Sequence, residues 1–452
     1  MKIRITISAL LLAGCSLCHG QAVPAGDSSM SSTLGPNLPT LDGVVHYSLS
    51  ASEVFQFGYY GSGTTTHATD LTGNLAYTSR SLALPFSALF SGGVVLGDQQ
   101  GQGNTSFWNA SVSQGYVTRQ WIFNVTDSFS FLPQSPETGL SGIPGVGDLG
   151  AAPVLGPTSG PAGGVLTTSG DRISNSLSGS VERQLVPNTS LSGTGSWGVL
   201  HYLGNPGVES ESAENGLAEG LDSTSISGTV ALNHRLDARS SVSLDAMYST
   251  YSYSGIESGP QEPNFQTRGL NLSYQRVLSR TLSVNASVGP QWVSSSNSAL
   301  IPSALNVAIN AGVSYGYRNT HAFVGYTRGA NGGGGVFPGA RSDSISGSVG
   351  RSFGRDWVGS LNGAYTHTTG LTVFESGSST VPTNDSYHTT YGGAQVTRRF
   401  SPHFSGYASY TVQNQSNNGL TNVVVQNVLS GASQTLGFGV TFAPRSTSLG
   451  QF

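Results

Sequence analysis

Charged side chains are the residues of this sequence that could do chemistry, and they are few. They make up 9% of the 452 residues, against about 25% in an average soluble protein. The histidines, such as His201, His321 and His367, lack the spacing of a metal site, and no serine lies in a G-x-S-x-G motif with triad partners. The charges are therefore expected to attract or repel solutes rather than to make or break bonds. We expect no enzyme activity, no cofactor and no metal.

Arginines recur at short joints between alternating stretches of sequence. In "SYQRVLSRTLSVNASV", residues 273 to 288, two such stretches meet at a joint that carries Arg276 and Arg280. Lys2 and Arg4 lie at the N-terminus, which leaves 17 of the 19 basic residues for the rest of the chain. Twelve of those 17 lie at or beside a joint: Arg80, Arg119, Arg183, Arg235, Arg239, Arg276, Arg280, Arg318, Arg351, Arg355, Arg398 and Arg399.

The stretches on either side of each joint alternate with period two, which is typical of strands with one apolar and one polar face. After the joint at 276–280, one face carries Leu282, Val284, Ala286, Val288 and Trp292, and the other carries Ser283, Asn285, Ser287 and Gln291. About eight such hairpins recur, with a first strand near residues 46–60 and a last strand "QTLGFGVTF". The pattern predicts about eighteen antiparallel strands, with sixteen as the alternative count.

Short joints at one end and long connections at the other are the layout of an up-and-down transmembrane β-barrel. An open sheet would leave backbone N–H and C=O groups unpaired in hydrocarbon, at several kcal/mol each, so the sheet is expected to close. A secreted β-helix fits poorly because its rungs are shorter than this period of about 40 residues. A series of β-sandwich domains is the main alternative fold. The predicted fold class is all-β.

On these patterns the chain resembles the bacterial outer-membrane β-barrel proteins, the porins and their relatives, over roughly residues 45–442. Trp197 and Trp292 near the loop end of their strands, and Trp357 near the turn end, match the levels of the aromatic girdles of such barrels. The last strand carries Leu436, Phe438, Val440 and Phe442, and a tail then leads to Phe452. The resemblance implies a location in the bacterial outer membrane, with membrane lipid and the barrel assembly machinery as partners.

The N-terminus has the features of an export signal, with Lys2 and Arg4 before the short apolar run "ITISALLLAG". Two cleavage sites remain open. Residues 1–22 form the signal peptide if cleavage follows "GQA", and residues 1–14 do so if Cys15 in "LAGC" is lipidated. A flexible periplasmic lead is expected over 23–44, followed by the barrel over 45–452. Without Lys2 and Arg4 the net charge is 17 − 23 = −6, which gives no indication of nucleic-acid binding.

Three groups of residues are the candidates for function. Candidate charges of the lumen or its rim are Glu182, Asp245, Arg276, Arg280, Arg351, Arg355, Arg398 and Arg399. An acidic outer mouth is expected from Glu209, Glu211, Glu214, Glu219 and Asp222. The longest connection, 135–171, is expected to narrow or cover the pore, and its candidate constriction residues are Glu137, Leu140, Ile143, Asp148, Leu149 and Leu155.

The expected lumen face is mainly Ser, Thr, Asn and Gly, with Glu182 and Asp245 as exceptions. Such a face favours a water-filled, weakly selective diffusion channel for small solutes. Two other functions stay open: a structural or accessory barrel of an envelope or polysaccharide export system, and a surface adhesin. Neither the solute nor the oligomeric state follows from the sequence.

Overall fold

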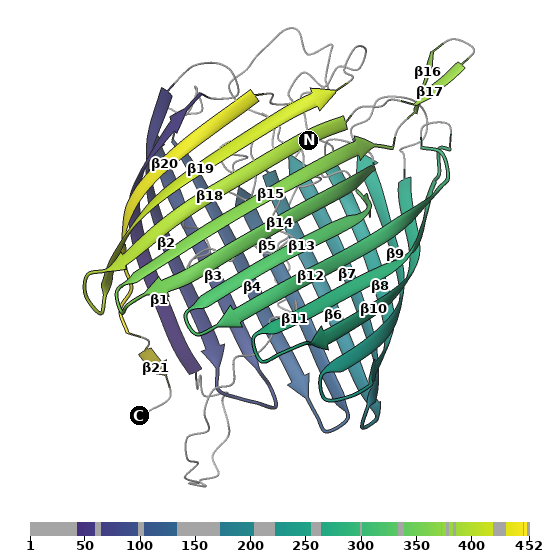
Figure 1. The fold of residues 1–452 in the computed structure, drawn as a ribbon, viewed down its shortest axis with the longest axis horizontal. Helices are drawn as coiled ribbons and strands as arrows, with labels where there is room; N and C mark the ends of the chain where they lie inside the picture. Colours follow the sequence, from purple (N-terminus) through teal and green to yellow (C-terminus); the bar gives the residue numbers. More distant parts are fainter. Residues whose placement is uncertain are drawn as a thin grey trace, which may run out of the picture.

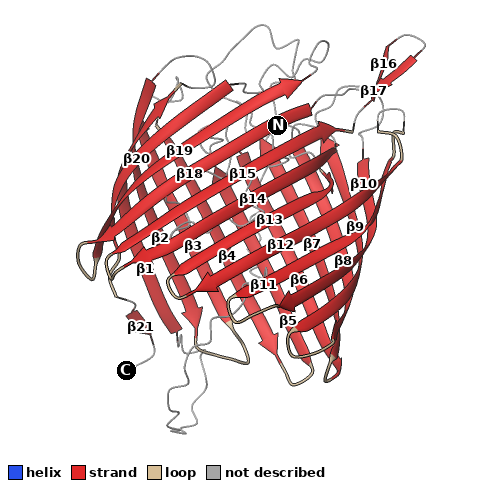
Figure 2. Ribbon diagram, viewed as in Figure 1, coloured by secondary structure: helices blue, strands red, loops and turns tan. Residues whose placement is uncertain are grey.

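The structure, a computed structural model, describes most of the chain from residue 43 onward. The described ranges are 43–58, 65–97, 104–132, 172–202, 222–254, 264–298, 301–332, 339–371, 373–376, 379–382, 386–418, 431–445 and 447–449. Strands make up nearly all of this part, and none of it is helical (Figure 2). No described helix is therefore long and apolar enough to cross a membrane.

Eighteen strands of 12 to 15 residues form the wall of the molecule. The first nine are β1 (Gly43–Phe57), β2 (Thr65–Ser79), β3 (Phe86–Gly97), β4 (Thr105–Val117), β5 (Trp121–Leu132), β6 (Arg172–Val186), β7 (Thr189–Tyr202), β8 (Asp222–Arg235) and β9 (Ser240–Ser254). The other nine are β10 (Asn264–Val277), β11 (Leu282–Ser295), β12 (Ala304–Tyr317), β13 (Thr320–Asn331), β14 (Ala340–Phe353), β15 (Trp357–Gly370), β18 (Ser386–Arg399), β19 (Phe404–Asn418) and β20 (Gly431–Phe442).

Each strand pairs antiparallel with the next along the chain, and the sheet closes on itself (Figure 1). The closing pair is β1 with β20, from Leu49 opposite Phe442 to Phe57 opposite Gln434. A separate hairpin of β16 (Val373–Ser376) and β17 (Ser379–Pro382) lies outside the wall at one end. The predicted all-β barrel of eighteen antiparallel strands is confirmed.

The segment after β20 continues the wall. The short strand β21 (Thr447–Leu449) pairs with the first residues of β1, Gly43 opposite Leu449. The tail after Phe442 therefore pairs with Gly43 to Val45 of β1, which β20 does not reach. Both described ends of the chain lie at the same end of the barrel, as an even number of strands requires.

The two ends of the barrel differ in their connections. Eight joints, from two residues at 187–188 to six at 80–85, lie at what we call the turn end. All the longer connections, 133–171 the longest, join strand ends at the opposite end of the barrel, which we call the loop end. This asymmetry is the one that the sequence predicted.

Short polar side chains close the joints of the turn end. The Asp237 carboxylate accepts hydrogen bonds from the backbone N–H groups of Arg239 at 2.5 Å and Ser240 at 2.8 Å, and from the Ser240 hydroxyl at 2.6 Å. Hydroxyl oxygens do the same elsewhere, with Thr118 accepting from Trp121 N–H and Ser401 from Phe404 N–H. In the two-residue joint 318–319, Arg318 adopts a φ of 51°, which short hairpin turns require of their residues.

Register determines the two faces of the wall because paired residues in neighbouring strands share a face. Val288 of β11 lies opposite Leu272, which lies opposite Leu244, then Leu232, then Leu191. These side chains are 41 to 55% exposed, so an apolar row follows the outside of the barrel. The alternate residues, such as Ser287, Ser273 and Ser243, form a polar row on the inside.

The first prediction concerns these two faces. Val288→Arg places a cation at mid-strand on the outer face, where it costs about 2–4 kcal/mol if that face borders lipid. Ser287→Arg, one residue earlier, places the same cation in the lumen and is expected to be tolerated. Urea unfolding of both variants in lipid vesicles measures the difference. Equal destabilisation of the two would contradict the assignment of the faces.

The second prediction concerns pH and the Asp237 joint. The hydrogen bonds from Ser240 and from the backbone N–H of Arg239 hold the pKa of the Asp237 carboxyl below its ordinary value of 3.8. A lowered pKa stabilises the folded state above the ordinary pKa, and this contribution is lost as the pH falls through the folded value. Wild type should therefore unfold at higher urea than Asp237→Ala at pH 7, and the gap should narrow as the pH falls below 3.8. A gap that stays constant as the pH falls below 3.8 would show that the charge is not its cause.

Candidate functional site

The inward-facing side chains of the eighteen strands, which we call the lumen wall, are mostly small, polar and uncharged. Strand β14 is representative, with Ser344, Ser346 and Ser348 on the lumen wall, and Ile345 and Val349 outside at 47 and 45% exposure. The wall is predominantly Ser, Thr, Asn, Gln and Gly. Such side chains offer both donors and acceptors, so the wall can be wetted without selecting a charge.

Hydrogen bonds between strands fix many of these side chains. Hydroxyl pairs join Ser111 with Ser128 at 3.0 Å and Ser196 with Ser227 at 2.6 Å. At the closing pair, Gln56 Nε2 donates to Ser433 Oγ at 2.9 Å. These bonds hold the polar groups against the wall and away from the axis of the barrel.

Three carboxylates interrupt the neutral wall. Glu182 on β6 and Asp245 on β9 lie four and five residues from the turn end of their strands, and Asp70 on β2 lies five residues from the loop end. Asp245 accepts a hydrogen bond from Ser273 Oγ at 2.8 Å. Asp70 is 3% exposed, and its Oδ1 has no hydrogen-bond partner among the described residues. The sequence prediction named Glu182 and Asp245 and missed Asp70.

Basic residues on the lumen side lie at the turn end. Arg235 and Arg399 end β8 and β18, and both side chains are exposed. Among the described side chains, the charges of the lumen are therefore arranged with carboxylates along the wall and guanidinium groups at one rim. This distribution favours cations inside the barrel.

An apolar cluster stands on the lumen wall at the loop end. Tyr253, Phe265, Val293 and Ile301 are at most 3% exposed and pack together, and Leu371 packs against them. The Tyr253 hydroxyl donates to the carbonyl of Gly332 at 2.7 Å. We call these four residues the mouth cluster. Ile301 and Leu371 come from connections between strands, so part of those connections lies over the inner wall and narrows the mouth.

The sequence prediction missed the mouth cluster. Tyr253, Phe265 and Val293 occupy inward positions of β9, β10 and β11, where alternation predicts polar residues. The sequence signal that could have revealed these three residues is a large apolar side chain at a position where the alternation expects a polar one. Residue 301 lies outside any strand, so the alternation gives no information about its contact with Phe265 and Val293.

Aromatic rings and arginines mark the outer face at the turn end. Guanidinium groups lie over rings in Arg183–Trp121 at 5.0 Å, Arg318–Tyr317 at 5.1 Å, Arg351–Phe353 at 5.4 Å and Arg398–Trp357 at 5.1 Å. Trp197 and Trp292 are 41 and 45% exposed toward the loop end. Apolar surface between two aromatic belts is the outer surface of a transmembrane β-barrel, and the molecule has the porin architecture that the sequence resembled.

The candidate rim charges do not form one group in the structure, because they lie on the lumen side, on the outer face and in the joints. Glu182, Asp245 and Arg399 belong to the lumen side. The others lie outside the barrel or in the joints: Arg276, Arg351 and Arg398 on the outer face, and Arg280 and Arg355 in the joints after β10 and β14.

Most of the remaining candidates lie outside the described residues. These are Cys15, Glu137, Leu140, Ile143, Asp148, Leu149, Leu155, Glu209, Glu211, Glu214 and Glu219. The fifth residue of the acidic mouth, Asp222, begins β8 and contacts His201 Nδ1 with its Oδ2 on the outer face.

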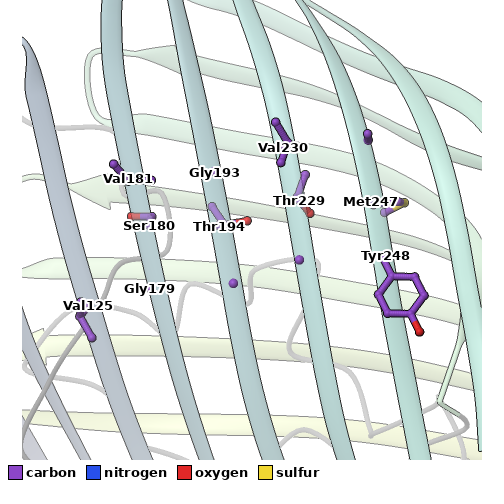
Figure 3. Close-up of a pocket in the computed structure, with 13 residues that line it drawn as sticks. Val125, Gly179, Ser180, Val181, Gly193, Thr194, Thr229, Val230, Met247 and Tyr248 are labelled. Carbon is purple, nitrogen blue, oxygen red and sulfur yellow. The ribbon is translucent and has the colours of Figure 1, made fainter.

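A hollow of about 660 Å³ on the outer face is separate from the lumen (Figure 3). Gly179, Gly195 and Gly228 lie opposite one another in β6, β7 and β8, and Val181, Val230 and Tyr248 border the depression. The lining is apolar, so the hollow suits lipid chains and belongs to the membrane surface.

No family model and no curated protein matches the chain. Among solved structures, OpdK of Pseudomonas aeruginosa has 9% identity and a TM-score of 0.44, over 90% of this chain and 100% of that one. OccK2 (OpdF) of the same organism has 10% identity and a TM-score of 0.44, over 89% and 98%. OccAB3 of Acinetobacter baumannii has 11% identity and a TM-score of 0.44, over 89% and 100%. Likeness at this level carries no information on the solute.

The third prediction concerns the mouth cluster. Phe265→Ala removes a fully buried ring, which costs about 3–5 kcal/mol of stability for a core phenylalanine, and should raise single-channel conductance because the cluster narrows the mouth. Phe438→Ala is the matched control, since Phe438 is 47% exposed on the outer face. Equal conductance of Phe265→Ala and wild type in a planar bilayer would show that the cluster does not limit flow.

Proposed function

We propose that the protein is a channel of the bacterial outer membrane through which small, uncharged or weakly cationic polar solutes diffuse. The observation that carries the proposal is the contrast between the two faces of one closed wall. The outer face is apolar and bordered by aromatic rings, and the lumen wall is polar and nearly free of charge. A barrel of 16 to 18 strands leaves room for an aqueous passage.

The orientation follows from the connections. In outer-membrane barrels the short joints face the periplasm and the long loops face outward. The turn end with its arginines over aromatic rings is then the periplasmic end. Arginine can bury its stem in apolar surface and reach the headgroups with its guanidinium, so these arginines serve the membrane rather than the passage.

The lumen wall determines which solutes are favoured. Ser, Thr, Asn and Gln exchange hydrogen bonds with water or with hydroxylated solutes at similar free energy, so passage of a neutral polar solute meets no strong binding site. Glu182 and Asp245 add a weak attraction for cations, and the almost fully buried Asp70 adds less. The mouth cluster limits the size of the solute and gives the entrance an apolar side.

The alternative functions differ in one measurable property. A structural barrel of an export system or a surface adhesin has no need of a continuous passage. Swelling of proteoliposomes in neutral sugars of increasing size tests the proposal. Swelling with small sugars and none with large ones is expected, and no swelling with any sugar would contradict it.

The fourth prediction concerns ion selectivity. Wild type should show a mild preference for K⁺ over Cl⁻ in a salt gradient. The preference should weaken as KCl is raised from about 0.1 M to 1 M, because the Debye length falls from about 10 to 3 Å. The triple variant Asp70→Asn/Glu182→Gln/Asp245→Asn should lose most of the preference.

The matched control for selectivity is Glu53→Gln. Glu53 accepts a hydrogen bond from Thr69 at 2.6 Å, and both residues lie on the outer face with Phe438. Its removal should leave the reversal potential unchanged. An anion preference in wild type, or an equal shift in Glu53→Gln and in the triple variant, would contradict the assignment of charge to the lumen.

A further inference from the structure

A row of polar and titratable residues crosses the outer face at the loop end, where lipid rather than the lumen is the neighbour. Arg328 lies opposite Asp343, which lies opposite His367, which lies opposite His388, which lies opposite Ser416. Each of the five lies two or three residues from the loop end of its strand, in β13, β14, β15, β18 and β19. We call these five residues the polar row.

Contacts between neighbouring strands link the members of the row. The Tyr326 hydroxyl donates to Asp343 Oδ1 at 2.9 Å, and Arg328 Nε lies 3.5 Å from the same oxygen. The rings of His367 and His388 stack at 4.4 Å. The Tyr365 hydroxyl lies 2.7 Å from His388 Nδ1. These contacts hold the side chains against the wall.

Donors exceed acceptors around the row. Arg341 lies on β14 two residues from Asp343, opposite Ala330 of β13, so two guanidinium groups flank one carboxylate. The Nε of Arg341 and the Nδ1 of His367 are buried and lack a hydrogen-bond partner among the described residues, and the Nε of Arg328 has only its 3.5 Å ion pair with Asp343. A guanidinium group presents five N–H donors and no acceptor, so the arrangement suits a ligand rich in acceptors.

The place of these two arginines in the chain is unusual. Thirteen of the 17 arginines after residue 22 lie at or near the turn end; the exceptions are Arg172, Arg268, Arg328 and Arg341. Arg328 and Arg341 are diagonal neighbours on adjacent strands. Two adjacent, partly buried cations are costly unless an anion accompanies them, and Asp343 balances only one.

We propose that Arg328, Arg341 and His367 bind a phosphate of a lipid headgroup in the outer leaflet. Arginine pairs with phosphate through two parallel N–H···O bonds. The row faces away from the lumen, so a solute in the passage does not reach it, and it lies at the level where headgroups meet the barrel. The inference rests on the membrane placement given under the proposed function and does not depend on conduction.

The experiment measures lipid binding by the full-length refolded protein. Diphosphorylated lipid A is titrated into the protein in dodecyl maltoside micelles, and native mass spectrometry gives the fraction of protein with bound lipid. The double variant R328Q/R341Q should bind lipid A at least about tenfold more weakly, as the loss of charge-assisted hydrogen bonds predicts. Arg268→Gln is the matched control, a cation in the loop-end half of the outer face that lies over Tyr248 instead, and should bind like wild type.

A further variant separates ligand binding from a structural ion pair. Asp343→Asn removes the anion that competes with phosphate, so it should bind lipid A as tightly as wild type or more tightly. If Asp343→Asn weakens binding as much as R328Q/R341Q, the row is a structural ion pair and the proposal fails. If R328Q/R341Q does not fold, Arg341→Gln, which leaves the Arg328–Asp343 contact in place, provides the same comparison.

Two other outcomes would overturn the proposal. Arg268→Gln weakening binding as much as the double variant would show attraction by net charge alone. Displacement of lipid A by millimolar inorganic phosphate would show a site for free anions. Conductance of each variant is recorded in parallel and should equal that of wild type. A protein that binds lipid A through the row but conducts no ions would contradict the proposed channel and leave the lipid site intact.

Discussion

The demand that every backbone N–H and C=O be paired determines this structure. In hydrocarbon an unpaired group costs several kcal/mol, so a sheet can be stable there only without edges. The pairing of β1 with β20 removes both edges at once, and the extension of that seam by β21 pairs the end of β1 that would otherwise stay open. Closure then forces each strand to present one face to lipid and the other to the lumen. The separation of apolar and polar residues follows from the backbone rather than from a core.

The asymmetry between the two ends has a similar basis. Joints of a few residues need specific hydrogen bonds, as at Asp237 and Thr118, and they bring strand ends to the headgroup level. Four arginines there lie over aromatic rings of the outer face, and Arg235 and Arg399 end their strands on the lumen side. Cations therefore anchor the barrel at one end, while Glu182 and Asp245 supply most of the negative charge of the passage.

The sequence predicts the features of the barrel that depend on neighbouring residues and on a regular repeat along the chain. Strand number, face and the two kinds of connection follow from alternation and from the lengths of the segments between strands. The same alternation could have predicted that Asp70 faces the lumen, since it is in phase with Thr72 and Asn74 on β2. Tyr253, Phe265 and Val293 of the mouth cluster are also in phase with the polar face, whereas Ile301 meets Phe265 and Val293 through a connection, whose path alternation does not predict. The polar row depends on the register across five strands, which long loops leave undetermined in sequence. The candidates in 135–171 and 203–221 lie outside the described residues and stay predictions.

The central claim is that one face of each strand borders water inside the barrel. Cysteine scanning of β14 tests it directly, because the only native cysteines, Cys15 and Cys18, lie near the N-terminus. Cysteines are placed singly at residues 344 to 349 in the protein reconstituted in vesicles, and a charged, membrane-impermeant maleimide is added. The account predicts rapid labelling at Ser344, Ser346 and Ser348 and little at Ile345, Gly347 and Val349. Equal labelling at both sets, or none at the serines, would contradict a water-filled lumen.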